Sequence, residues 1–134
     1  MAWTTEQQRA IDARGNLIVS AAAGAGKTAV LTERVARLVE QGASMDRMLI
    51  LTFTRAAAGE MKGRIEDRLL LLAREAAGEG QKLLRRQALL CRSAQISTIH
   101  AFCARVVNRH FHMAELSPGV TTLDETESAV LMEQ

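Results

Sequence analysis

A short glycine-rich stretch, Gly24-Ala25-Gly26-Lys27-Thr28, restricts the fold of this chain more than any other feature. It follows the apolar run Leu17-Ile18-Val19 and precedes residues with helical periodicity, so we expect it where a strand gives way to a helix. Glycine lets the backbone turn so that its N–H groups point inward, and the next helix contributes unpaired amides and the positive end of its dipole. This combination is typical of a loop that holds phosphate.

The residues of this loop supply the chemistry of a nucleotide site. Lys27 can reach the β- and γ-phosphates, and the Thr28 hydroxyl can ligate the magnesium ion that bridges them. The general pattern is G-x-x-x-x-G-K-[ST], and Ala21 occupies its first position. The predicted nucleotide-binding residues are Ala21, Ala22, Ala23, Gly24, Ala25, Gly26, Lys27 and Thr28, with Lys27 as the catalytic residue and Thr28 as the Mg²⁺ ligand. A helix that merely follows a small-residue loop would not need the Lys-Thr pair.

Composition limits the class of protein. A chain of 134 residues forms at most one domain, and with 48% hydrophobic but only 3% aromatic residues its core must be aliphatic. No apolar run approaches the roughly 20 residues that span a bilayer, and the first residues begin no secretory signal, so we expect a cytoplasmic protein without membrane contact. Cys91 and Cys103 lack metal-ligand spacing, which predicts reduced, partly buried thiols.

Charge is distributed unevenly along the chain. Residues 1–112 carry 17 Lys/Arg and 10 Asp/Glu, whereas residues 113–134 carry no Lys/Arg and 5 Asp/Glu. The basic part suits a polyanionic partner, but a net charge of this size is equally common on ordinary solvated surfaces. Charge alone therefore leaves both interpretations open.

Apolar runs that alternate with amphipathic segments predict a doubly wound α/β layer, which binds ligands at the carboxyl ends of parallel strands. The predicted strands are 16–20, 48–53 and 95–98, and the second of these is apolar enough to be buried on both faces. The predicted helices are 28–41, 55 to 76 or 77, 81–92 after a break at 78–80, and 99–111 with Phe102, Val106 and Val107 facing inward. A turn at 117–119 and a further helix that begins at 124–127 complete the prediction.

A capped helix is also predicted at the start of the chain, over residues 3–11, and it leaves two interpretations of Gln7 open. Thr4 and Gln7 have the spacing of a capping box, in which each residue satisfies a backbone N–H group of the other. Alternatively, Gln7 lies beside the phosphate loop and reads adenine, because a carboxamide can pair with N6 and N7 of that base. The residues themselves do not choose between these roles.

Four motifs in order give the chain a recognisable resemblance. They are Trp3-Thr4-x-x-Gln7-x-x-Ala10-Ile11, the phosphate loop, Thr52-Phe53-Thr54-Arg55-Ala56-Ala57-Ala58-x-Glu60-Met61-x-x-Arg64-Ile65, and Ser97-Thr98-Ile99-His100-x-Phe102-Cys103. Together they resemble the Q motif, phosphate loop, motif Ia and T-x-H motif of UvrD/Rep-like superfamily 1 DNA helicases. Within this family the chain is most similar to the N-terminal part of the A subunit of AddAB-type (RexAB-type) helicase-nucleases, which repair double-strand breaks.

The resemblance implies an ATP- and Mg²⁺-dependent motor that moves along single-stranded DNA, with a RecA-like P-loop NTPase fold that is incomplete at the C-terminus. Residues 1–112 would form the N-terminal part of the first motor domain, and residues 113–134 a linker and the truncated start of an inserted helical subdomain. Gln7 would join the nucleotide site. The implied DNA-binding residues are Thr52, Phe53, Thr54, Arg55, Thr98, His100 and Phe102. Their alternative roles are structural, since aromatic side chains fill cores and threonine hydroxyls cap helices.

The sequence departs from the family in places. Arg55 replaces the usual Asn after T-F-T, Gly59 replaces the alanine before Glu60, and Ala29 stands where many relatives have Arg. No Asp-Glu pair follows an apolar strand, although ATP hydrolysis needs such a group to hold Mg²⁺ and place the water. We therefore expect a fragment of a larger helicase that does not itself hydrolyse ATP. The parent protein would work with a second helicase-nuclease subunit, and the sequence leaves open whether it also has an exonuclease domain.

Two other functions fit the phosphate loop. A different P-loop NTPase or a small-molecule phosphotransferase would need a substrate lid and an acidic strand, and neither is evident in the sequence. A non-catalytic interaction module would retain the loop for structure only. Salt-dependent binding of single-stranded DNA distinguishes the helicase interpretation from both, because phosphate contacts release counterions.

Overall fold

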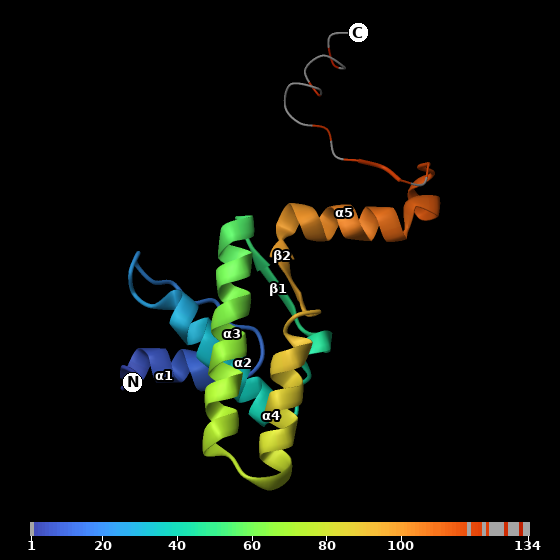
Figure 1. Ribbon diagram of the computed structural model, residues 1–134. Coiled ribbons are helices and arrows are strands. Elements are labelled where there is room, and N and C mark those ends of the chain that lie inside the picture. The colour runs from blue at the N-terminus through green and yellow to red at the C-terminus, as the bar shows by residue number, and fades with distance from the viewer. Residues whose placement is uncertain (1, 118, 122, 124–127, 129–131, 133–134) are drawn as a thin grey trace.

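The computed structural model describes residues 2–117, 119–121, 123, 128 and 132, and these form an α/β arrangement with a small parallel sheet (Figure 1). The elements in chain order are α1 (Thr5–Asp12), α2 (Lys27–Glu40), the 3₁₀ turn η1 (Met45–Arg47), β1 (Leu49–Thr52), α3 (Arg55–Glu75), α4 (Gly78–Leu90), β2 (Gln95–Thr98), α5 (Ile99–Arg109) and the 3₁₀ turn η2 (Phe111–Ala114). No helix in the described part of the chain has both the length and the apolar composition needed to cross a bilayer.

The two strands are parallel neighbours, with Leu49 opposite Gln95 and Thr52 opposite Thr98. Parallel strands need a crossover connection, which α3 and α4 provide here. The prediction of strand 95–98 is confirmed, and the strand predicted at 48–53 is confirmed with shorter bounds. Because both strands run the same way, their carboxyl ends meet at one edge of the sheet.

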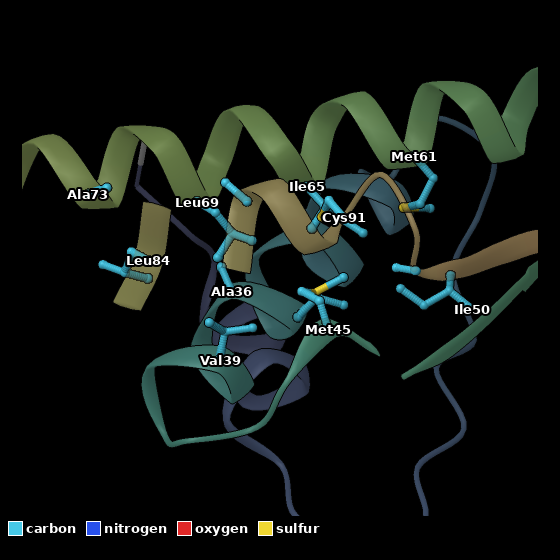
Figure 2. Close-up of a cluster of buried hydrophobic side chains, with 13 residues drawn as sticks. Ala36, Val39, Met45, Ile50, Met61, Ile65, Leu69, Ala73, Leu84 and Cys91 are labelled. Carbon is cyan, nitrogen blue, oxygen red and sulfur yellow. The ribbon is translucent and has the colours of Figure 1, made fainter. Parts of the chain in front are cut away.

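Helix α3 supplies the central stripe of the core. Met61, Ile65, Leu69 and Ala73 follow one another at four-residue spacing and are buried (Figure 2). They pack against α2, α4 and one face of the sheet. The other members of this buried cluster are Val35, Ala36, Val39, Met45, Ile50, Leu84, Ala88, Cys91 and Ala94. The prediction of an aliphatic core is confirmed for the described residues, since no aromatic side chain belongs to it.

Two buried polar groups join the helices. Glu33 is 4% exposed, and its carboxylate accepts hydrogen bonds of 2.6 and 3.0 Å from Nε and Nη2 of Arg68. Nε of Arg37 lies 3.5 Å from the same carboxylate. The Arg68 hydrogen bonds hold the pKa of Glu33 below its ordinary value. Gln87 in α4 accepts a hydrogen bond from the backbone N–H of Met45 at 2.8 Å, which fixes the entry to β1.

Both cysteine thiols are free. Burial raises the pKa of Cys91 to about 11, whereas Cys103 is exposed.

The prediction of a buried strand at 16–20 is wrong. Residues 13–26 contain neither helix nor strand, and Ile18 is 95% exposed. An apolar run becomes a strand only where a neighbouring strand takes up its N–H and C=O groups. In the described residues, the one ladder joins β1 to β2, and the segment lies outside it.

Three smaller predictions also need correction. In β1 only Ile50 is buried, because the helices cover a single face of the sheet and leave Leu49 and Leu51 exposed. Helix α5 extends away from the other helices (Figure 1), so Val106 and Val107 are exposed instead of facing inward. Residues 78–80, expected to separate two helices, instead form the first turn of α4. Pro118, in the turn predicted at 117–119, and the helix start predicted at 124–127 lie outside the described residues.

Replacement of Glu33 by Gln should lower the free energy of unfolding by about 1–3 kcal/mol at neutral pH, since Arg68 loses its charged partner. The folded-state pKa of Glu33 is lower than its ordinary value of 4.5, so the contribution is complete above about pH 4.5 and is lost as the pH falls through the folded-state pKa. Urea unfolding from pH 3 to 8 measures this. The difference in free energy of unfolding between wild type and variant should become smaller at acidic pH.

The matched control is Glu60→Gln, which removes an exposed carboxylate that pairs with Arg64 at 2.6 Å within α3. An exposed pair of this kind contributes about 0.5 kcal/mol or less. Two results would contradict the role of the Glu33–Arg68 pair: an equal loss of unfolding free energy in both variants, or a loss in Glu33→Gln that does not depend on pH.

Candidate nucleotide and nucleic-acid site

The glycine-rich loop has the backbone that the sequence predicts. Gly24 and Gly26 have φ values of 76° and 79°, in the left-handed region that favours glycine, and Gly26 caps the N-terminus of α2. The N–H group of Ala25 donates to the carbonyl of Ala22 at 3.3 Å and closes the turn. The loop therefore leads directly into the start of a 14-residue helix, where unpaired amides favour an anion.

The Lys27 ammonium group lies against this loop. Its Nζ atom donates hydrogen bonds to the carbonyl oxygens of Ala21 at 2.7 Å and Ala22 at 2.8 Å. The Thr28 side chain, on the next residue of α2, is exposed. A phosphate that binds Lys27 would replace two neutral carbonyl oxygens as hydrogen-bond acceptors of the ammonium group. The loop thus places a cation, a hydroxyl and a helix N-terminus together.

Both interpretations of Gln7 are compatible with its position. The capping box is confirmed, because the Gln7 N–H donates to Thr4 Oγ1 at 3.2 Å and the Thr4 N–H donates to Gln7 Oε1 at 3.0 Å. Nε2 of the same side chain also donates to the Ala25 carbonyl at 3.3 Å. A carboxamide has two donors and two acceptor positions, so one of each stays free. The role of Gln7 in reading adenine remains a prediction.

A cavity of about 580 Å³ lies beside the loop. This volume is within the range of pockets that bind small molecules. It is lined by Thr4, Glu6, Gln7, Ala10, Leu17, Val19, Ser20, Ala21, Ala25, Lys27, Val30, Leu31 and Arg34. The lining residues come from α1, the segment 17–21, the loop and α2, so segments far apart in the sequence meet at the predicted nucleotide site.

The second set of predicted residues gathers at the carboxyl edge of the sheet. Thr52 and Thr98 are opposite each other in the strand ladder, so the two motifs that follow β1 and β2 begin side by side. Phe53 is 90% exposed, and Arg55 and His100 are exposed as well. An aromatic ring, a guanidinium group and an imidazole are therefore accessible at one edge of the sheet.

Three threonines of this set have structural roles. Thr54 Oγ1 accepts from the Ala57 N–H at 3.1 Å and caps α3, and Thr98 Oγ1 accepts from the Ala101 N–H at 3.1 Å and caps α5. The predicted capping role of both hydroxyls is confirmed. Thr52 Oγ1 donates to the Thr54 carbonyl at 3.0 Å. The Phe102 side chain is half-buried at the base of α5, so Phe53 is the more accessible of the two rings.

The sequence analysis missed Arg34. Its Nη1 atom donates to the carbonyls of Ala10 at 2.8 Å and Ile11 at 3.2 Å, at the end of α1. A signal was available, because Lys27, Val30 and Arg34 have the spacing of one helix face. The pattern alone does not say which segment that face contacts.

Replacement of Gly26 by Ala should lower the free energy of unfolding by about 1–3 kcal/mol, because a residue with a side chain is strained at this φ value. The new Cβ would also lie 3.4 Å from Gln7 Nε2. Gly59→Ala is the matched control, since Gly59 lies inside α3 and a methyl group added there would meet nothing within 4 Å. Alanine there should stabilise by about 0.5–1 kcal/mol. Urea unfolding measures both, and effects of the same sign would contradict the loop geometry.

Comparison with known proteins places these motifs in a family context. Residues 3–134 match the family model described as "UvrD/REP helicase N-terminal domain". Three similar curated proteins are each named as the A subunit of an ATP-dependent helicase/nuclease. The protein from Alkaliphilus oremlandii is 50% identical over 131 residues, that from Alkaliphilus metalliredigens 51% over 131 residues, and that from Geobacillus thermodenitrificans 48% over 136 residues. The matches cover 96%, 96% and 98% of this chain but only 11% of each relative.

Proposed function

The chain belongs to the UvrD/REP helicase N-terminal domain family, and we propose that it carries the ATP phosphate loop and part of the single-stranded DNA groove of an ATP-dependent DNA helicase. The observation that carries this proposal is the meeting of four distant motifs at two places. Gln7 and Lys27 both bind carbonyls of the phosphate loop, and Thr52 lies opposite Thr98 where the other two motifs begin.

For the fold we propose a RecA-like P-loop layer, in which residues 1–112 belong to the first motor domain and residues 113–134 lead into an inserted helical subdomain. The parallel pair of strands, the helical crossover and the loop at the start of α2 support this assignment. In an open parallel sheet, ligands bind at the carboxyl ends of the strands. The proposed DNA groove satisfies this rule, since its residues follow β1 and β2.

In the proposed ATP site, the amides at the start of α2 receive the phosphates and Lys27 neutralises their charge. Thr28 would hold Mg²⁺, which would supply positive charge to offset that of the phosphates. The residues fit this group, because an exposed hydroxyl follows directly after the lysine. Gln7 would contact the adenine through the donor and acceptor that its hydrogen bonds leave free.

In the proposed DNA groove, the exposed Phe53 ring stacks on a base, while Arg55 and the His100 imidazole face the backbone phosphates. Thr52, Thr54 and Thr98 shape the strand ends, and Phe102 lines the base of the groove. Stacking does not depend on sequence, because every base has an aromatic face. The groove would therefore suit a motor that moves along any sequence.

The activity of the whole protein is also part of the proposal. The names of the relatives describe a helicase/nuclease and one of its subunits, so we propose a cytoplasmic DNA-repair enzyme that unwinds DNA, cuts it, and works with a partner subunit. A small-molecule phosphotransferase is disfavoured, because the family match extends over the two motifs that a phosphotransferase does not need.

Replacement of Lys27 by Ala should weaken binding of a fluorescent adenine nucleotide by about ten-fold or more, because a charged hydrogen bond to phosphate contributes about 1.5–3 kcal/mol. Fluorescence anisotropy with and without Mg²⁺ measures this. Guanine nucleotide as competitor tests base selectivity. Equal affinity of wild type and variant would refute the nucleotide site, and Lys82→Ala, which removes an exposed lysine of α4, is the matched control.

Replacement of Phe53 by Ala should weaken binding of a single-stranded oligonucleotide by about 1–3 kcal/mol, the contribution of one stacked base. It should leave the unfolding midpoint unchanged, because the ring is 90% exposed. Leu89→Ala is the control, since it removes a 63% exposed apolar side chain from α4. The affinity of the wild type for the oligonucleotide should fall steeply as the salt concentration rises from about 50 to 300 mM. An affinity that changes neither with salt nor on loss of the Phe53 ring would contradict the proposed DNA groove.

A further inference from the structure

We propose that Arg34 is a positioning residue, which sets the preference for adenine by holding the helix that carries Gln7. This inference rests on the proposed nucleotide site. It assigns a role to a side chain that lies outside all four sequence motifs.

Helix α1 depends on contacts outside itself. It has eight residues, and an isolated helix of this length is unstable in water. Among the helices and strands it packs chiefly against α2, and its Ile11 side chain is 3% exposed. The chain that follows it, residues 13–26, contains no helix or strand that could hold it in place.

Arg34 holds the carboxyl end of α1. The carbonyls of Ala10 and Ile11 belong to the last turn and have no partner within the helix. Nη1 of Arg34 donates to both, at 2.8 and 3.2 Å. A cation is also favoured at this end by the helix dipole. The guanidinium group thus supplies both the missing donor and the favourable charge.

The other end of α1 meets the phosphate loop. Gln7 lies one turn before Ile11, and its Nε2 atom donates to the Ala25 carbonyl at 3.3 Å. Gln7 and Arg34 both line the cavity beside the loop. With Arg34 in place, α1 is held at both ends, which restricts where the Gln7 carboxamide lies. Without it, the 3.3 Å hydrogen bond from Gln7 to Ala25 and the buried Ile11 side chain remain, while the 3.0 Å hydrogen bond from Thr4 to Gln7 Oε1 lies within the cap of α1 and does not join the helix to the loop.

Hydrogen exchange of the free chain tests the anchor without nucleotide. In Arg34→Met the amides of α1 should exchange about ten-fold faster or more, since two charged hydrogen bonds are lost. The amides of α3 should be unchanged, and Arg34→Lys should restore part of the protection. Arg37→Met is the matched control, because Arg37 is an exposed arginine of the same helix whose ion pair is with Glu33 of α2 itself. Unchanged α1 protection, or a uniform loss across all helices, would overturn the inference.

Nucleotide binding tests the consequence. In Arg34→Met the preference for adenine over guanine nucleotide should fall by about five-fold or more, as expected when one base contact is lost. The affinity for inorganic tripolyphosphate, which has no base, should stay within about two-fold of the wild-type value. In a Gln7→Ala background, Arg34→Met should have little further effect on the preference, since both act on the same contact. Additive effects would instead assign Arg34 a direct contact and overturn the positioning role.

The two failures are distinguishable. If wild type binds no nucleotide, or Lys27→Ala binds equally well, the proposed function fails. If wild type prefers adenine and Arg34→Met keeps that preference, only this inference fails.

Discussion

The buried stripe of α3 is the contact on which the rest of the structure depends. Met61, Ile65, Leu69 and Ala73 lie between the sheet, α2 and α4, so one helix brings together elements from most of the described chain. A two-stranded sheet cannot bury enough apolar surface by itself. Packing under α3 covers one face of the sheet, and it supports the edge where the carboxyl ends of β1 and β2 meet.

Polar contacts then relate the two candidate sites to each other. Helix α2 begins at the glycine-rich loop and α3 begins at the capping Thr54, so each of these helices starts at one of the two candidate sites. The Glu33–Arg68 pair joins the helices directly, with its carboxylate almost fully buried. Because breaking such a pair leaves a buried charge without its partner, it favours one arrangement of α2 against α3.

Local rules predicted the parts of the site that depend on neighbouring residues. The Thr4–Gln7 box, the caps at Thr54 and Thr98 and the positive φ values of the loop glycines all follow from interactions within about four residues. The same rules were insufficient for the strand expected at 16–20, for the second face of β1 and for the inner face of α5. Burial of each of these segments depends on a second segment that packs against it. An apolar pattern shows that burial would be favourable, but it does not show which segment, if any, covers the residues.

The amino-acid sequence alone predicts a phosphate loop with Lys27 and Thr28, and it contains four motifs in a family order and residues that cap its own helices. Two contacts are visible only once the chain is folded: Gln7 binds the loop while it also caps α1, and Arg34 in α2 donates to the end of that helix. The reason is physical. Capping and turn conformations are set within a few bonds, whereas a hydrogen bond between residues 24 apart exists only after packing has placed the two helices side by side.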